Sequence, residues 1–215
     1  MRTALIVGIL GLFAVNVCSA EDVHQWGRFR GSLESAQDHK DPVRDVTLEV
    51  EFTGPGGKKS TRLGFWDGGR TWRVRFSPDQ TGKWIWRSRC RQDSGLNGER
   101  GEFRCIAYTG DNLLYRHGPI RVSQNGRHLA HVNGTPFFWL VDTVWNGALL
   151  SSKPDWDRYL DNRVSKKFTG IQFVTTQWRT AYTDAEGMVA YTGFEKIKIN
   201  PAFFQRMDDR IDTGC

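Results

Sequence analysis

The sequence lacks the local patterns on which several common chemistries depend. It contains neither a Gly-rich phosphate-binding loop nor a Gly-x-Ser-x-Gly turn, so it carries no signature of nucleotide binding or of a serine hydrolase of that type. Its five histidines show no metal-ligand spacing with a suitable carboxylate or cysteine, and we expect no metal and no other cofactor. The net charge of +6 is spread along the chain rather than clustered, which argues against a nucleic-acid partner.

Long apolar runs are also scarce, and the one at the amino terminus has the features of a targeting segment. Arg2 precedes an apolar stretch at residues 4–17, too short to span a bilayer, and small residues lead to the charged pair Glu21-Asp22. This pattern predicts a signal peptide over residues 1–20 and a secreted or periplasmic bacterial protein with no membrane segment after its removal. Lipoprotein processing at Cys18 is the alternative, although the preceding residues lack the small side chains that such a site prefers.

Cysteine is rare, with four in the chain and one of them inside the predicted signal peptide. Cys90 and Cys105 lie in neighbouring strand-like runs, symmetrically about turn residues at 94–98, and both share the parity of inward-facing aromatic residues. Because an exported protein meets an oxidising compartment, this arrangement predicts a cross-strand disulfide between Cys90 and Cys105. The alternative is a pair of free thiols buried in the core.

The first half of the chain has the period of antiparallel strands. Residues 45–53 alternate strictly between apolar and polar side chains, as a half-buried strand does. Turn residues separate this segment from four further strand-like runs at 62–66, 71–77, 83–91 and 101–108. Short strands at this spacing, without a helical period, predict an immunoglobulin-like β-sandwich domain over residues 21–118.

The second half changes character and predicts an α/β unit. Turn signals at Asn125-Gly126 and Asn133-Gly134 precede a continuous apolar run at 136–141, which is typical of a strand buried on both faces. A helix is predicted to begin after Ser152, a second strand at 170–176, and a second helix at Asn200-Pro201. A (β/α)8 barrel requires about 250 residues and eight strands. Residues 119–215 are therefore expected to form only the first βαβα part of a TIM barrel, truncated at its carboxyl end.

Several stretches resemble known families. GFWDGG at 64–69 and WRVRFSP at 72–78 resemble the small β-sandwich domain of unknown function that precedes apiosidase-like glycoside hydrolases. PFFWLVDTVW at 136–145 resembles the first barrel strand of those hydrolases, with Val141 and Val144 where Gly and Ala are usual. The resemblance implies a secreted enzyme that acts on plant or microbial polysaccharide, with an acid/base and a nucleophile from later barrel strands.

Glycosidic cleavage requires two facing carboxyl groups, and the sequence offers no such pair, so no catalytic residue is assigned. The ends of the two predicted barrel strands supply candidate contacts to a polysaccharide or oligosaccharide: Asp142, Thr143, Trp145, Gln177 and Trp178. Asp142 could accept hydrogen bonds from sugar hydroxyls or form a salt bridge at the strand end. Trp145 could stack on a sugar ring or pack in a core. Asp184 and Glu186, in the following loop, are expected to be solvated.

Two functions remain open from the sequence. The chain is either the amino-terminal piece of a glycoside hydrolase, inactive by itself, or a non-catalytic carbohydrate- or surface-binding β-sandwich module. A stripe of arginines could serve the second function by binding an acidic polysaccharide, although a solvated sheet face explains the same residues: Arg73, Arg75, Arg87, Arg89 and Arg91. A third possibility is a structural spacer that packs on its own barrel.

Overall fold

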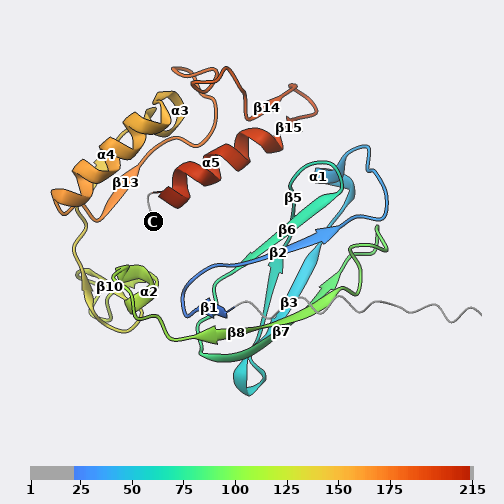
Figure 1. Cartoon of the computed structure of the whole chain (residues 1–215), viewed down its shortest axis with the longest axis horizontal. Helices are drawn as coiled ribbons and strands as arrows, with labels where there is room; N and C mark the ends of the chain where they lie inside the picture. Colours follow the sequence, from blue (N-terminus) through green and yellow to red (C-terminus); the bar gives the residue numbers. More distant parts are fainter. Residues whose placement is uncertain (1–21, 214–215) are drawn as a thin grey trace, which may run out of the picture.

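The computed structural model describes residues 22–213, so the predicted signal peptide and Cys215 lie outside the described residues. A β-sandwich forms one part, and a layer of helices with a short parallel strand pair forms the other (Figure 1). No helix within residues 22–213 is long and apolar enough to cross a membrane.

The sandwich consists of a five-stranded and a three-stranded sheet. The larger sheet has the order β1 (Asp22–His24), β8 (Arg100–Ile106), β7 (Gly82–Arg89), β3 (Glu49–Thr53) and β4 (Lys59–Leu63). The smaller sheet has the order β2 (Phe29–Glu34), β6 (Thr71–Phe76) and β5 (Phe65–Trp66). The predicted alternation is confirmed, because Trp72, Val74 and Phe76 are all buried. Aromatic rings stack across the two sheets, with centroids 4.2 Å apart for Phe52 and Phe76, and this core joins the sheets.

Two predicted strands of the sandwich differ from the structure. The strand predicted over 45–53 begins only at Glu49. Asp45 ends a one-turn helix, α1 (Pro42–Asp45), and residues 46–48 belong to neither a helix nor a strand. The strand predicted over 62–66 is divided between the two sheets at Gly64. The Gly64 amide donates to Leu48 O at 2.8 Å, and a Cβ at this position would collide with the Leu48 side chain. This close approach of the backbone to the core requires glycine.

The predicted disulfide is wrong, and the hairpin register gives the reason. Cys90 and Cys105 are both free and buried. In the β7–β8 ladder, Cys105 lies opposite Gly82, whereas Cys90 follows the end of β7. Eight residues of strand separate these two positions, or roughly 26 Å, which is far beyond the reach of a disulfide. The alternative of two buried thiols is therefore what the structure contains.

The chain then passes through α2 (Leu113–His117) into a small antiparallel sheet with the order β11 (Pro136–Phe137), β10 (Leu129–His131) and β9 (Ile120–Val122). The turns predicted at Asn125-Gly126 and Asn133-Gly134 connect these strands, and Gly126 and Gly134 have φ angles of 71° and 93°. The continuous buried strand predicted over 136–141 is wrong. The chain leaves β11 and enters a different sheet at β12 (Val141–Thr143), and Trp139 between them is 63% exposed.

The βαβ unit follows. Strand β12 pairs in parallel with β13 (Gly170–Gln172), and the connection between them contains α3 (Gly147–Leu150) and α4 (Lys153–Ser165). Ser152 caps α4 as predicted, because its Oγ accepts from the Asp155 amide at 3.2 Å. A short hairpin of β14 (Tyr191–Thr192) and β15 (Lys198–Ile199) leads into α5 (Pro201–Thr213). The helices share one apolar core: Ala148, Leu149, Trp156, Leu160, Phe203 and Met207.

Helix α5 also contacts the smaller sheet of the sandwich (Figure 1). Arg75 on β6 pairs with Asp208, and Arg28 and Arg30 pair with Asp212. Arg73 pairs with Asp67 inside the sandwich. Because Arg73 and Arg75 lie on one sheet and Arg87 and Arg89 on the other, these arginines do not form the single stripe considered from the sequence.

Candidate functional site

The carboxyl ends of β12 and β13 place the predicted site residues at one edge. Thr143 lies opposite Gln172 in the parallel register, and the ladder extends beyond both strands. The Val144 amide donates to Gln172 O and the Val174 amide to Trp145 O, each at 2.9 Å. Functional loops in α/β folds follow the carboxyl ends of parallel strands, so this edge is the candidate functional site.

The two faces of this strand pair have different surroundings. Asp142 and Val144 face the helical layer, where Asp142 contacts α4 and Val144 packs against the apolar core. Thr143 and Trp145 alternate with them and lie on the other face, where Thr143 is exposed and Trp145 is 51% exposed. The side chains available to a ligand therefore come from the face opposite the helices.

Asp142 is held by α4 rather than directed to solvent. Its Oδ2 accepts from Tyr159 Oη at 2.9 Å and from Arg163 Nε at 2.5 Å, and its Oδ1 accepts from the Thr143 amide at 2.9 Å. The hydrogen bond from Tyr159 and the ion pair with Arg163 hold the pKa of Asp142 below its usual range, against a smaller opposing effect of burial. The sequence left two roles open for Asp142, a contact to sugar hydroxyls and a salt bridge at the strand end. The contacts in the structure are those of the salt bridge.

Trp145 and Trp178 form an aromatic pair at the edge. Their ring centroids are 5.8 Å apart with the planes inclined by 34°. Trp178 Nε1 donates to Asn146 Oδ1 at 2.7 Å, and the Arg179 guanidinium lies 5.8 Å from the centre of the Trp178 ring. The indole of Trp178 is therefore fixed on two sides, and Trp145 extends the flat apolar surface towards solvent.

Gln177 supports the loop that follows. Its Nε2 donates to Tyr191 O at 2.6 Å, and its Oε1 accepts from the amides of Ala190 at 2.7 Å and Tyr191 at 3.3 Å. These bonds join the segment that follows β13 to the hairpin of β14 and β15. Both ends of the Gln177 amide are therefore bonded to backbone groups. Gln177 contributes to the site indirectly, by anchoring the chain next to Trp178.

The expectation of two solvated loop carboxylates is wrong for Asp184. This residue is 3% exposed, its Oδ1 accepts from the amides of Glu186 at 3.0 Å and Met188 at 2.8 Å, and Arg206 of α5 pairs with its other oxygen. Its loop folds back onto the side chain because the carboxylate satisfies the turn amides. Glu186 remains half-exposed and also contacts Arg206.

Sequence reasoning missed three residues that organise the site: Asn146, Tyr159 and Arg163. Tyr159 and Arg163 lie four residues apart on α4, a spacing that places both on one helix face. That spacing was a usable signal, but their shared partner Asp142 precedes them in a different element. Within residues 22–213, no group of three or more His, Cys, Asp or Glu side chains is placed to hold a metal ion.

Two family models match the chain. Residues 22–91 match a domain of unknown function, DUF5060, and residues 123–213 match the apiosidase-like catalytic domain. None of the curated proteins matches the chain.

One solved structure shares the fold of most of this chain, and a second is similar over a smaller part. A crystal structure from Bacteroides vulgatus ATCC 8482, described as a "putative glycoside hydrolase", is 24% identical with a TM-score of 0.71 over 90% of this chain and 39% of its own. A glycoside hydrolase family 5 structure from the same organism is 24% identical, covering 46% of this chain and 23% of its own, with a TM-score of 0.40. The chain thus spans 39% of the length of the first of these structures.

Proposed function

We propose that this chain, which combines a DUF5060 domain with an apiosidase-like catalytic segment, is the amino-terminal part of a secreted bacterial glycoside hydrolase acting on plant or microbial polysaccharide. The relation to glycoside hydrolases comes from the sequence match and the shared fold. The observation that carries the proposal is the Trp145–Trp178 pair at the carboxyl ends of β12 and β13. In the proposed enzyme these strands begin a (β/α)8 barrel, whose substrate would lie at this edge.

The proposed contacts to sugar follow from the orientation of each side chain. Trp145 and Trp178 present rigid apolar faces on which the C–H face of a sugar ring packs. The Thr143 hydroxyl lies on the same exposed face as Trp145 and supplies a donor and an acceptor for sugar hydroxyls. Asp142 and Gln177 act indirectly. Asp142 fixes β12 through its contacts with α4, and Gln177 fixes the loop beside Trp178.

The proposal assigns no catalytic step to this chain alone. Retaining and inverting hydrolases need two carboxyl groups separated by about 5–9.5 Å, one protonated and one ionised. At this edge Asp142 is paired with Arg163, and Asp184 is buried with Arg206. Asp142, which Tyr159 and Arg163 hold ionised, is a poor general acid, and Asp184 is buried away from solvent. We therefore propose that the acid and the nucleophile or base are supplied by a segment that follows residue 215.

The experiment compares Trp145→Ala with Trp139→Ala. Both tryptophans are more than half exposed, but Trp139 precedes β12 and lies at the opposite strand end. With neutral oligosaccharides as probes, Trp145→Ala should weaken binding by about tenfold, the effect of losing one aromatic contact, and Trp139→Ala should leave it unchanged. Equal effects of the two variants would contradict the site, and release of reducing ends by this chain alone would contradict the assignment of catalysis to a later segment.

The alternative function, a carbohydrate- or surface-binding β-sandwich, has one observation in its favour. A sizeable cavity, lined by aromatic and charged side chains, lies against the sandwich and apart from the edge formed by β12 and β13.

A further inference from the structure

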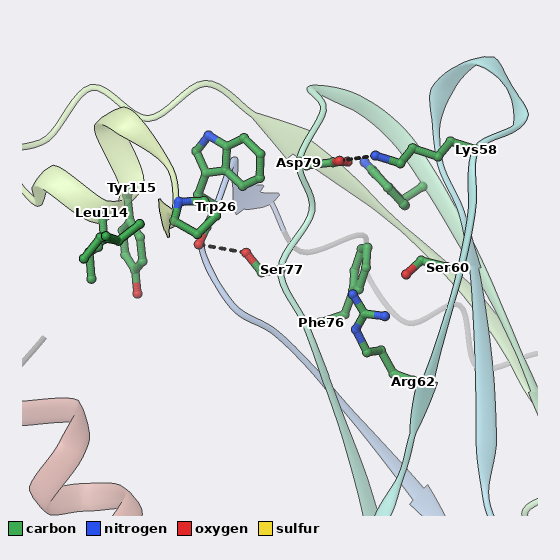
Figure 2. Close-up of a pocket in the computed structure, with 12 residues that line it drawn as sticks. Trp26, Lys58, Ser60, Arg62, Phe76, Ser77, Asp79, Leu114 and Tyr115 are labelled. Carbon is green, nitrogen blue, oxygen red and sulfur yellow. Dashed lines mark hydrogen bonds and ion pairs between the residues drawn. The ribbon is translucent and has the colours of Figure 1, made fainter. Parts of the chain in front are cut away.

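A cavity of about 540 Å³ lies between the sandwich and the segment that leads out of it (Figure 2). One wall comes from β4 and β6 of the sandwich, and the opposite wall from α2, with Leu114 and Tyr115, and from the start of β9. Ligand sites commonly have volumes of about 300–1,000 Å³ and often lie where two parts of a protein meet. Both its size and its position make this cavity a candidate binding site.

Aromatic side chains form the apolar surface of the cavity. Trp26 and Tyr115 are partly exposed and present the accessible rings (Figure 2), whereas Phe76 and Trp84, 5% and 1% exposed, close the cavity from the sandwich core. Trp26 has a φ of 63°, an uncommon conformation for a bulky residue. Three hydrogen bonds hold this conformation: the Trp26 amide to Pro78 O at 2.8 Å, the Gly27 amide to His24 O at 2.8 Å, and Ser77 Oγ to Trp26 O at 3.0 Å. The fold therefore maintains a strained residue at the cavity wall, where strain commonly accompanies a binding role.

The charged groups around the cavity leave one positive charge uncompensated. Lys58 pairs with Asp79, so these two side chains together are neutral. The Arg62 guanidinium lies 5.5 Å from the centre of the Phe76 ring, and its Nη1 donates to Thr61 O at 2.8 Å. Within residues 22–213, no carboxylate forms an ion pair with Arg62. Stacking on Phe76 holds the guanidinium at the wall with donors left for a ligand, beside the Ser60 hydroxyl (Figure 2).

From this arrangement we infer that the cavity binds a saccharide that carries a carboxylate, as a uronate residue does. The carboxylate pairs with Arg62, the sugar ring packs on the aromatic surface, and Ser60 and Tyr115 face its hydroxyls. A planar guanidinium matches a carboxylate in two hydrogen bonds, which a neutral sugar cannot provide. The saccharide part of this inference rests on the proposed carbohydrate function, whereas the anion part rests on the cavity alone.

The test titrates the full chain with oligosaccharides of galacturonate, glucuronate and mannuronate, with their methyl esters, and with acetate. Binding is followed by calorimetry and by the indole N–H signal of Trp26. At least one uronate series should bind, and both its methyl ester and acetate should bind about tenfold more weakly, because each lacks one of the two interactions. Binding of none of the uronates would overturn the inference. Equal binding of the esters would overturn the role of charge, and equal binding of acetate would overturn the role of the sugar ring.

Variants locate the site and separate this inference from the proposed hydrolase function. Arg62→Gln should reduce uronate binding by about tenfold, while Arg87→Gln, a matched loss of an exposed arginine on β7 away from the cavity, should not. An unchanged affinity in Arg62→Gln would overturn the assignment. Trp145→Ala should leave uronate binding unchanged, because Trp145 does not line the cavity. A failure of the proposed substrate site at the β12–β13 edge can therefore be distinguished from a failure of the uronate site in the cavity.

Discussion

Arg75 of strand β6 and Asp208 of helix α5 form an ion pair between the sandwich and the helical layer, with Nη1 3.0 Å from Oδ1. The same guanidinium lies 4.9 Å from the centre of the Phe65 ring, which fixes it on the sheet surface. Arg28 and Arg30 hold Asp212 one turn further along α5, and Gln205 Nε2 donates to Asp67 O at 2.8 Å. These contacts attach α5 to the smaller sheet of the sandwich, and they link the two segments that the family models match.

A double-mutant cycle of Arg75→Ala and Asp208→Ala measures this link. Both side chains are about one-third exposed, so we expect a coupling of about 0.5–1 kcal/mol in the free energy of unfolding, the upper range for partly exposed pairs. The coupling should fall when salt is raised, because ions screen partly exposed charges. The Arg70–Asp38 pair within the sandwich is the control, since Asp38 is 78% exposed and should show no measurable coupling. Equal coupling in both pairs would contradict a specific role for α5.

The features that could be predicted from sequence are those determined by neighbouring residues. The alternation of Trp72, Val74 and Phe76, the turns at Asn125 and Asn133, and the Ser152 cap all depend on local patterns, and the structure confirms them. The sequence match to the two families likewise depends on contiguous residues.

The features that could not be predicted depend on contacts between distant residues. The division of a strand at Gly64 results from its close approach to Leu48, the residue before β3. The pairing of Asp142 with Arg163 and of Asp184 with Arg206 requires the helix positions. Trp145 and Trp178 form an aromatic pair, but the contacts of Trp178 with Asn146 and Arg179 depend on the three-dimensional structure.

The free thiols give a second prediction. Burial, together with the nearby charge of Asp79, raises the pKa of the Cys105 thiol to about 11, and Cys90 is also buried. Because the thiolate is the reactive form, neither thiol should react with a disulfide reagent at pH 8 in the folded protein. In a Cys18→Ser, Cys215→Ser background, we expect no labelling under native conditions and labelling of both thiols in guanidinium without reductant. Absence of labelling after unfolding would indicate the disulfide that the hairpin register excludes.

Asp93 organises the loop of the hairpin whose register differs from the one expected from the sequence. Its side chain is fully buried in the loop between β7 and β8, where Oδ1 accepts from the amides of Ala36 at 3.0 Å, Gly95 at 2.8 Å and Leu96 at 3.2 Å. Its Oδ2 accepts from Ser35 Oγ at 2.6 Å and contacts His39 Nε2 at 2.8 Å. A single carboxylate thus orders a long loop and joins it to the end of β2. In the observed register, this loop is centred earlier in the chain than the glycines at 95 and 98 suggest.

The third prediction concerns the acid stability that this carboxylate provides. Burial favours the neutral form of Asp93, but the hydrogen bonds from Ser35, Ala36, His39 and Gly95 outweigh burial and hold the pKa of Asp93 well below its usual range. A lowered folded-state pKa means that the unfolded chain binds the proton more readily. The stabilisation is therefore complete above the unfolded pKa of about 4 and is lost as the pH falls towards the folded value.

Urea unfolding at pH 7 and pH 3 measures this effect in the unaltered protein, in Asp93→Asn and in Asp93→Ala. Asp93→Ala should lower the free energy of unfolding at pH 7 by about 2–3 kcal/mol, because several buried donors lose their acceptor. Asp93→Asn keeps one acceptor oxygen and should lose less. Because an amide does not titrate, the difference in the free energy of unfolding between the unaltered protein and Asp93→Asn should shrink from pH 7 to pH 3. The acid sensitivity due to Asp212 and the other carboxylates is present in both proteins and cancels in this difference. A difference that stays constant over this interval would mean that Asp93 does not titrate differently in the folded and unfolded chains, and that the loop is held by the shape of the side chain rather than by its charge.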